Sequence, residues 1–296
     1  MSRAPWPLIE VVIEPKSPDD LTLNAALRSL ADEDANLRVS DANERGQLIL
    51  GGLDETQLDR TVEALKLTVA RGISVGAPQI AYRETLGRSA TVEHTYRKHL
   101  GGTSAFARVQ ISFEPSRAGS GYRYEVAPSG TVVPPEYLPG VERGLEAARH
   151  KGLSAGFPVI DFTATLIDGT HSDINSSPLA FQIAAEGAFD RLREEGAPKL
   201  LEPIMKVEVT TPEDYVGDVI GELNLRRGQI DGSDQRGDEQ VIIAMVPLAN
   251  MFNYVNSLWS ITQGRAAFHM EYDHYEAVPQ QLPPDDTFPS AMALRA

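Results

Sequence analysis

The side chains of this sequence that are able to act as acids, bases, metal ligands or nucleophiles are scattered along it. His94 and His99 flank Lys98, and His269 lies near His274, but structural or solvent-exposed roles are favoured over metal binding for both pairs. No serine stands in a G-x-S-x-G turn, and the absence of cysteine excludes thiolate nucleophiles, thiolate metal sites and disulfides. We therefore predict no catalytic residue, no metal site and no cofactor site in this chain.

Phosphate binding is the other chemistry to consider. No G-x-x-x-x-G-K-S/T loop occurs in the 296 residues, so the amides and the lysine that hold nucleotide phosphates are missing, and GTP hydrolysis by this chain is not expected. Arg226 and Arg227 follow a predicted helix, and their planar guanidinium groups are suited to phosphates and bases. A solvated arginine pair near a helix C-terminus explains these two residues equally well.

The charge balance limits the partners. The chain holds 27 Lys and Arg against 42 Asp and Glu, a net charge of -15, and every third of it is acidic. This argues against a free-standing nucleic-acid binder, because nonspecific affinity comes mainly from cations that neutralise phosphates. Any RNA contact is expected to be local or to be delivered by a larger assembly. No apolar run approaches a membrane span, and residues 1–7 lack a secretory signal, so we predict a cytoplasmic protein without membrane contact.

Two stretches of the sequence repeat one order of elements, β-α-β-β-α-β. The periodicities of the first predict elements at 8–13, 19–34, 37–39, 47–50, 56–70 and 73–75. Those of the second predict elements at 204–209, 216–225, 229–231, 240–247, 249–262 and 266–272, with Thr210 or Thr211 capping its first helix. This order predicts a ferredoxin-like fold, in which two helices cover one face of an antiparallel sheet.

The region between these stretches has its own α+β pattern. It predicts strands near 91–96, 106–114 and 122–126, helices near 135–151 and 178–196, and a strand pair around 159–167. Glycine and proline mark both seams, and the end of the chain is rich in proline. We predict an α+β protein of three domains in series, 1–83, 84–202 and 203–278, with a flexible tail at 279–296.

Long collinear runs of this sequence resemble bacterial translation elongation factor G. They include L-L-E-P-I-M-K-V-E-V at 200–209, N-L-R-R-G-Q-I at 224–230, P-Q-I-A-Y-R-E-T at 78–85 and A-G-F-P-V at 155–159. The resemblance spans residues 8–278 and implies that family's domains III, IV and V without its GTP-binding domain. It also implies that the middle domain resembles domain 2 of ribosomal protein S5.

The resemblance implies that the middle domain is a lever whose tip loops enter the decoding region of the ribosome. There they would contact transfer RNA and messenger RNA during translocation. The matching positions are Ser129, Gly130, Thr131, Val132 and Val133 in one loop and Gly169, Thr170, His171, Ser172 and Asp173 in the other. Arg226 and Arg227 are then candidate contacts with ribosomal RNA. From chemistry alone, ordinary solvent-exposed turns explain the two loops about as well.

The chain departs from the family pattern at several positions, which is consistent with a divergent paralogue. Ser172 stands at a usual His, for which His171 is a candidate substitute; Gln57 also replaces a common His, Trp259 a common Arg, and Leu225 the first residue of an arginine triplet.

Two functions and two origins remain open. One function is the arm of a translocating or ribosome-recycling GTPase, expected to be a monomer that works with the GTP-binding domain of the same polypeptide, where the family uses GTP and Mg. The other is a stand-alone ribosome-binding or protein-interaction module without a GTPase partner domain. A natural short protein and an expressed fragment are both compatible with a start at Met1.

Overall fold

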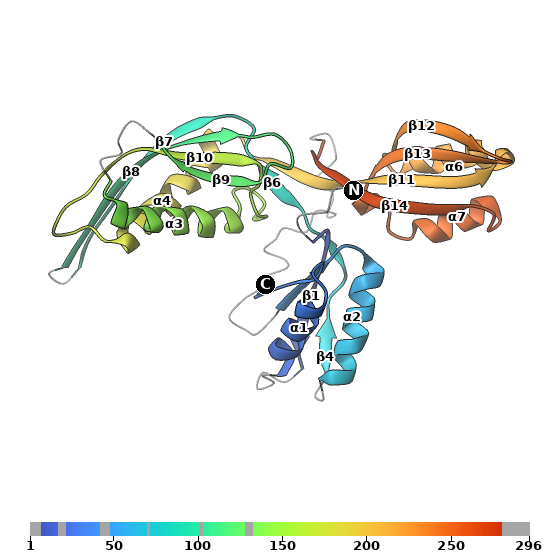
Figure 1. Cartoon of the computed structure of the whole chain (residues 1–296), viewed down its shortest axis with the longest axis horizontal. Coiled ribbons are helices and arrows are strands. Elements are labelled where there is room, and N and C mark those ends of the chain that lie inside the picture. Colours follow the sequence, from blue (N-terminus) through green and yellow to red (C-terminus); the bar gives the residue numbers. More distant parts are fainter. Residues whose placement is uncertain are drawn as a thin grey trace. The chain divides into compact units, whose positions relative to one another are not determined.

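The computed structural model of the chain describes residues 7–16, 22–41, 48–69, 72–100, 103–127 and 133–279. Packing divides the described residues into two compact units, one with residues up to 81 together with 202–276 and the other with residues 82–201 together with 277–279. Three sheets with their helices make up these units (Figure 1). Among the described helices, none has the length and apolar character needed to cross a membrane.

The first sheet confirms the predicted β-α-β-β-α-β order. Its elements are β1 (Ile9–Pro15), α1 (Thr22–Glu33), β2 (Arg38–Asp41), β3 (Leu48–Gly52), α2 (Glu55–Thr68) and β4 (Ile73–Val75). The strands lie in the order β2-β3-β1-β4 with antiparallel neighbours, and β5 (Gln79–Ile80) also pairs with β1. The apolar face of each helix packs inward, and leucines on both helices are therefore buried.

Gln57, one of the departures from the family pattern, joins the two helices of this domain. Asp54 caps α2 by accepting the Gln57 backbone N–H at 2.8 Å, and the Gln57 side chain accepts the Leu53 N–H at 2.8 Å. Its amide nitrogen donates to Asp34, just beyond α1, at 2.6 Å. Hydrogen bonds from the Asn36 backbone and from Gln57 lower the pKa of Asp34. Glutamine at position 57 therefore has a structural role in this chain.

The middle sheet is mixed and carries its helices on one side (Figure 1). Its elements are β7 (Ala90–Leu100), β8 (Thr103–Pro115), β9 (Tyr122–Val126), α3 (Leu138–Lys151), β10 (Phe162–Thr170), α4 (Pro178–Asp190) and α5 (Leu192–Glu195). The strand order is β7-β8-β10-β9, and β9 and β10 are parallel because α3 connects them. Phenylalanines from strands and helix, among them Phe113, Phe162 and Phe189, fill the core beneath the sheet.

The third sheet repeats the topology of the first. Its elements are β11 (Lys199–Pro212), α6 (Val216–Leu225), β12 (Gln229–Arg236), β13 (Glu239–Pro247), α7 (Tyr254–Thr262) and β14 (Ala267–Ala277). The order is β12-β13-β11-β14, and β6 (Arg83–Thr85) pairs with the first residues of β11. The α+β class with two ferredoxin-like sheets is thus confirmed.

The predicted threonine cap of α6 is wrong. Thr210 and Thr211 both lie inside β11, and Thr211 is completely buried. The chain leaves the strand at Pro212 and makes a short 3₁₀ turn, Glu213–Tyr215, before α6 begins, with no side-chain cap. Burial of Thr211 in the sheet outweighed its preference for a helix cap, and the 3₁₀ turn leads into the helix instead. Residues 280–296, most of the predicted tail, lie outside the described residues.

Candidate nucleic-acid interface

The second candidate loop, residues 169–173, begins at the end of β10. Along this strand Phe162, Ala164 and Leu166 are buried, as expected for alternate residues that face a core. The pairing of β10 with β8 shifts register between Leu166 and Asp168, so Ile167 is an extra residue. The alternation therefore restarts one residue later.

The bulge places Gly169 in the core and joins the two candidate loops. A Cβ atom at Gly169 would lie 2.3 Å from Val133 Cγ2 and 2.8 Å from the carbonyl oxygen of Arg108, so no larger side chain fits. Val133, the last residue of the first loop, is 3% exposed and packs in the core. The structure thus brings Val133 and Gly169 together. Ser129, Gly130, Thr131 and Val132 lie outside the described residues.

His171 packs onto an aromatic column. Its ring centroid lies 6.0 Å from that of Tyr137, which stacks on Phe181 at 4.9 Å. His171 Nε2 lies 3.3 Å from Asp173 Oδ1, and the His171 side chain is 25% exposed. Burial, followed by the carboxylates of Glu136 and Asp173, raises the pKa of Tyr137. The histidine is therefore oriented by its neighbours rather than free in solvent.

The loop closes on itself and on β8. The backbone N–H of Ser172 donates to Ser176 Oγ at 2.9 Å, and that hydroxyl donates to the Phe106 carbonyl at 2.6 Å. The Phe106 N–H in turn donates to the Asn175 carbonyl at 2.9 Å. Ser177 then caps α4 by accepting the N–H of Ala180. Ser172, which the sequence resemblance aligns with a histidine, thus has its N–H bound inside the loop.

The exposed part of the loop is acidic and apolar. The Asp173 side chain is 92% exposed, and Ile174, directly after the predicted loop, is 91% exposed. Thr170 is also exposed, and its hydroxyl oxygen accepts a hydrogen bond from Arg108. None of these three exposed residues is a cation that could neutralise a phosphate. The surface is therefore suited to contacts with bases, riboses or protein groups rather than with phosphates. Ile174 is not among the residues predicted from the sequence, where nothing distinguishes an exposed isoleucine from a core residue.

Arg226 is bonded within its own domain. Its Nε donates to Glu222 at 2.8 Å and its Nη2 to Ser257 Oγ at 2.9 Å, while Nη1 donates to the carbonyls of Asn250 and Phe252. Its side chain is only 17% exposed. These bonds link the end of α6 to the segment that leads into α7 and to α7 itself.

Arg227 has a similar internal role. It adopts a left-handed backbone conformation, with φ of 62°, directly after the C-cap of α6. Its guanidinium makes a two-pronged contact with Glu202, at 2.6 Å and 3.2 Å. The Glu202 side chain is 2% exposed, whereas that of Arg227 is 29% exposed. Neither arginine is the solvated residue that the sequence left as an alternative, and ribosomal RNA contact stays a prediction for both.

Comparison with known proteins places this architecture in a family. Three family models match the chain in series: "Elongation Factor G, domain III" over residues 4–76, "Elongation factor G, domain IV" over 78–196 and "Elongation factor G C-terminus" over 199–285. Elongation factor G of Hyphomonas neptunium (strain ATCC 15444) is 52% identical over 277 residues. That alignment covers 93% of this chain and 39% of the relative.

A solved structure has a similar fold. A crystal structure of a protein from Thermus thermophilus matches with a TM-score of 0.70 and 36% identity, covering 100% of this chain and 43% of that one. Fold and matches together define an arm of the kind found in translation elongation factors. The chain belongs to the elongation factor G family and corresponds to its domains III and IV and its C-terminal domain.

Proposed function

We propose that this chain is the ribosome-contacting arm of a GTP-dependent translation factor, and that its middle domain contacts transfer RNA and messenger RNA in the decoding region. The collinear match of three elongation factor G domains carries this proposal. The proposal includes a GTP-binding domain of the same polypeptide, which would bind GTP and Mg. The chain spans 39% of the length of its Hyphomonas relative. The same proposal has the protein act as a cytoplasmic monomer in translocation or ribosome recycling.

The geometry of the middle domain supports a tip contact. Val133 and Gly169 meet in the core, so the end of one candidate loop and the start of the other are adjacent. Beyond them Thr170, Asp173 and Ile174 are exposed. Contacts through these groups would be local and of short range, in keeping with an acidic chain that lacks broad electrostatic attraction to RNA.

Co-sedimentation with ribosomes at two salt concentrations tests the proposal. We expect the unaltered chain to bind, and Ile174→Ala to weaken binding several-fold because it removes an exposed apolar contact beside the loop. The matched control is Leu67→Ala, which removes a side chain that is equally exposed at 90% but lies on α2 of the first domain. No binding by the unaltered chain, or equal loss in the control, would contradict a specific tip contact.

A further inference from the structure

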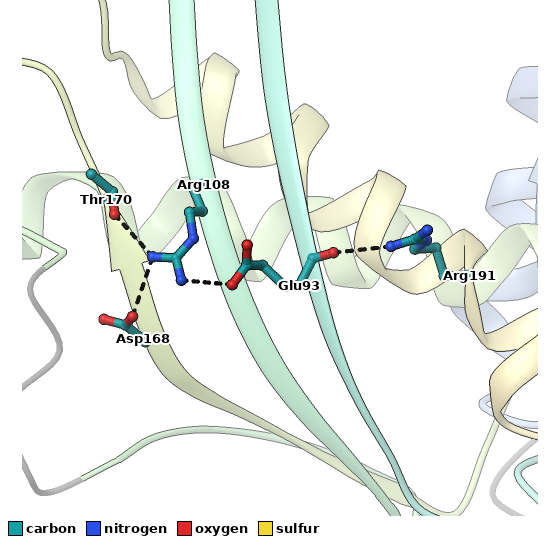
Figure 2. A network of polar contacts seen from close by, with 5 residues as sticks. All are labelled: Glu93, Arg108, Asp168, Thr170 and Arg191. Atoms are coloured by element: carbon teal, nitrogen blue, oxygen red, sulfur yellow. Dashed lines mark hydrogen bonds and ion pairs between the residues drawn. The ribbon is translucent and has the colours of Figure 1, made fainter.

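Arg108 lies on β8 between two neighbouring strands, and Figure 2 shows its guanidinium joined to both. Its Nη2 donates to Glu93 Oε2 on β7 at 2.6 Å. Its Nη1 donates to Asp168 Oδ2 at 3.3 Å and to Thr170 Oγ1 at 3.0 Å, both on β10. One planar side chain therefore spans three strands on the side of the sheet opposite the core.

This contact depends on the β10 bulge. Without the extra residue Ile167, Asp168 would continue the buried series and point into the core. With it, Asp168 and Thr170 reach the face where Arg108 lies, while Gly169 turns inward against Val133. The same bulge thus creates the polar partners of Arg108 and the packed start of the loop.

Both ends of the second candidate loop are consequently attached to β8. At the first end Arg108 holds Asp168 and Thr170. At the other end the backbone of Phe106, two residues before Arg108, bonds to Asn175 and to Ser176. Residues 171–174 lie between these attachments, and they include Asp173 and Ile174, which are proposed to contact RNA.

The ion pairs of Arg108 orient the side chains that they join more than they stabilise the folded domain. The side chains of Arg108, Glu93 and Asp168 are 27%, 49% and 39% exposed, and ion pairs with this much solvent contribute little to the free energy of unfolding. A guanidinium that donates to two carboxylates and a hydroxyl at once nevertheless fixes their relative positions. The hydrogen bond from Arg108 also lowers the pKa of Glu93, which keeps that carboxylate charged.

We propose that Arg108 is a positioning residue for the second tip loop: by holding Asp168 and Thr170 against Glu93 it fixes the start of residues 169–173 relative to the β7–β8 hairpin. The functional part of this inference rests on the proposed ribosome contact. The structural part does not.

Hydrogen exchange of the complete chain, without ribosomes, tests the structural part. In Arg108→Gln we expect the amides of residues 170–176, above all that of Ser172, to exchange about tenfold faster while α3 and α4 keep their protection. Arg108→Lys should show a smaller increase, because an ammonium keeps the charge without the planar fork. The matched control is Arg123→Gln on β9, whose side chain is 69% exposed and lies 3.7 Å from Glu125 on the same strand.

The outcomes separate the two ideas. If Arg108→Gln leaves the hydrogen exchange of the loop amides unchanged, or speeds exchange in α3 and α4 as well, the positioning role is overturned. This holds whatever the ribosome affinity of the variant. If the loop loosens, ribosome affinity should fall by about the factor measured for exchange. A loosened loop with unchanged affinity, in a chain whose Ile174→Ala variant does lose affinity, would overturn the functional part. Failure of the unaltered chain to bind ribosomes concerns the proposed function instead.

Discussion

Single residues around the second candidate loop show how tightly its start is packed. Gly169 accepts no side chain because Val133 and the Arg108 carbonyl occupy the space. His94, on β7 at the edge of the same sheet, is packed against α4, where a Cβ at Gly187 would lie 2.4 Å from its Nε2. Both residues therefore lead to predictions about the stability of the middle domain.

Gly169→Ala should destabilise the middle domain by about 1–3 kcal/mol, because the added methyl overlaps Val133 and backbone. The protection of β8 and β10 amides in hydrogen exchange would report the change. Adding Val133→Ala should recover part of the lost stability, since the overlap with Val133 is removed and only that with the Arg108 carbonyl remains. Losses in the double variant that simply equal the sum of the two single losses would contradict the contact.

The stability of the middle domain should fall as the pH drops below 6.5. Burial is the main cause of a lowered pKa at His94, Arg191 lowers it further, and Asp190 opposes them. Because the folded pKa lies below the usual 6.5, the unfolded chain binds the proton more readily, so stability is complete above that pH and declines below it.

Urea unfolding between pH 8 and pH 5 measures this decline, and His94→Gln should flatten it. His99→Gln, at an exposed histidine on the same strand, is the control for the substitution itself. A slope that persists in His94→Gln would assign the pH dependence to other groups.

At the scale of elements, buried carboxylates connect segments distant in sequence. Glu84, on the short strand β6, is completely buried. Its carboxylate accepts the backbone N–H groups of Leu153, Ser154, Ala155 and Phe157 at 2.7–3.1 Å. Such a cluster of amides is a natural anion site, and here a side chain of the chain itself fills it.

Glu84→Ala should cost the middle domain about 2–4 kcal/mol, because several buried N–H donors lose their acceptor at once. Glu84→Gln keeps one carbonyl oxygen and should cost less. Thermal unfolding followed by near-ultraviolet circular dichroism checks the order of the two variants. Equal and small effects would show that solvent replaces the carboxylate at little cost.

The arginines after α6 make a similar connection in the C-terminal domain. Arg227→Ala should destabilise that domain by about 3 kcal/mol, because it leaves the buried Glu202 carboxylate without its partner. Glu202→Gln in the same chain should recover part of the loss. Unfolding in urea, without RNA present, makes the measurement. Full stability of Arg227→Ala would favour a role for this residue outside the fold, such as contact with RNA.

At the scale of the whole molecule, net charge limits how the arm finds its partner. A chain of charge -15 has little nonspecific attraction to phosphates, so we expect binding to a naked single-stranded RNA at physiological salt to be weaker than about 0.1 mM. Fluorescence anisotropy measures this, and binding to ribosomes under the same conditions is the comparison. Tight, steeply salt-dependent binding to naked RNA would contradict recognition through a few local contacts.

Much of the fold was predictable from periodicity and family resemblance. The helix at 216–225 and the two β-α-β-β-α-β orders follow from local patterns of apolar residues, because helix and strand each bury a face with a fixed repeat. The candidate loops came from collinear motifs, with Gly169 among them. The expected strand pair near 159–167 is instead one strand, β10, preceded by a single bridge at Val159. The local pattern of residues does not specify which backbone segments pair with each other.

The amino-acid sequence by itself determined the family, the class of fold and the acidity of the arm, because these depend on composition, local periodicity and the order of motifs. Only the tertiary structure decided that Val133 is buried beside Gly169, that Arg226 and Arg227 are bonded internally, and that Arg108 donates to Asp168 and Thr170 at the start of the loop. The reason is register: a single extra residue at Ile167 exchanges the two faces of β10, and no local pattern in the sequence records where that exchange occurs.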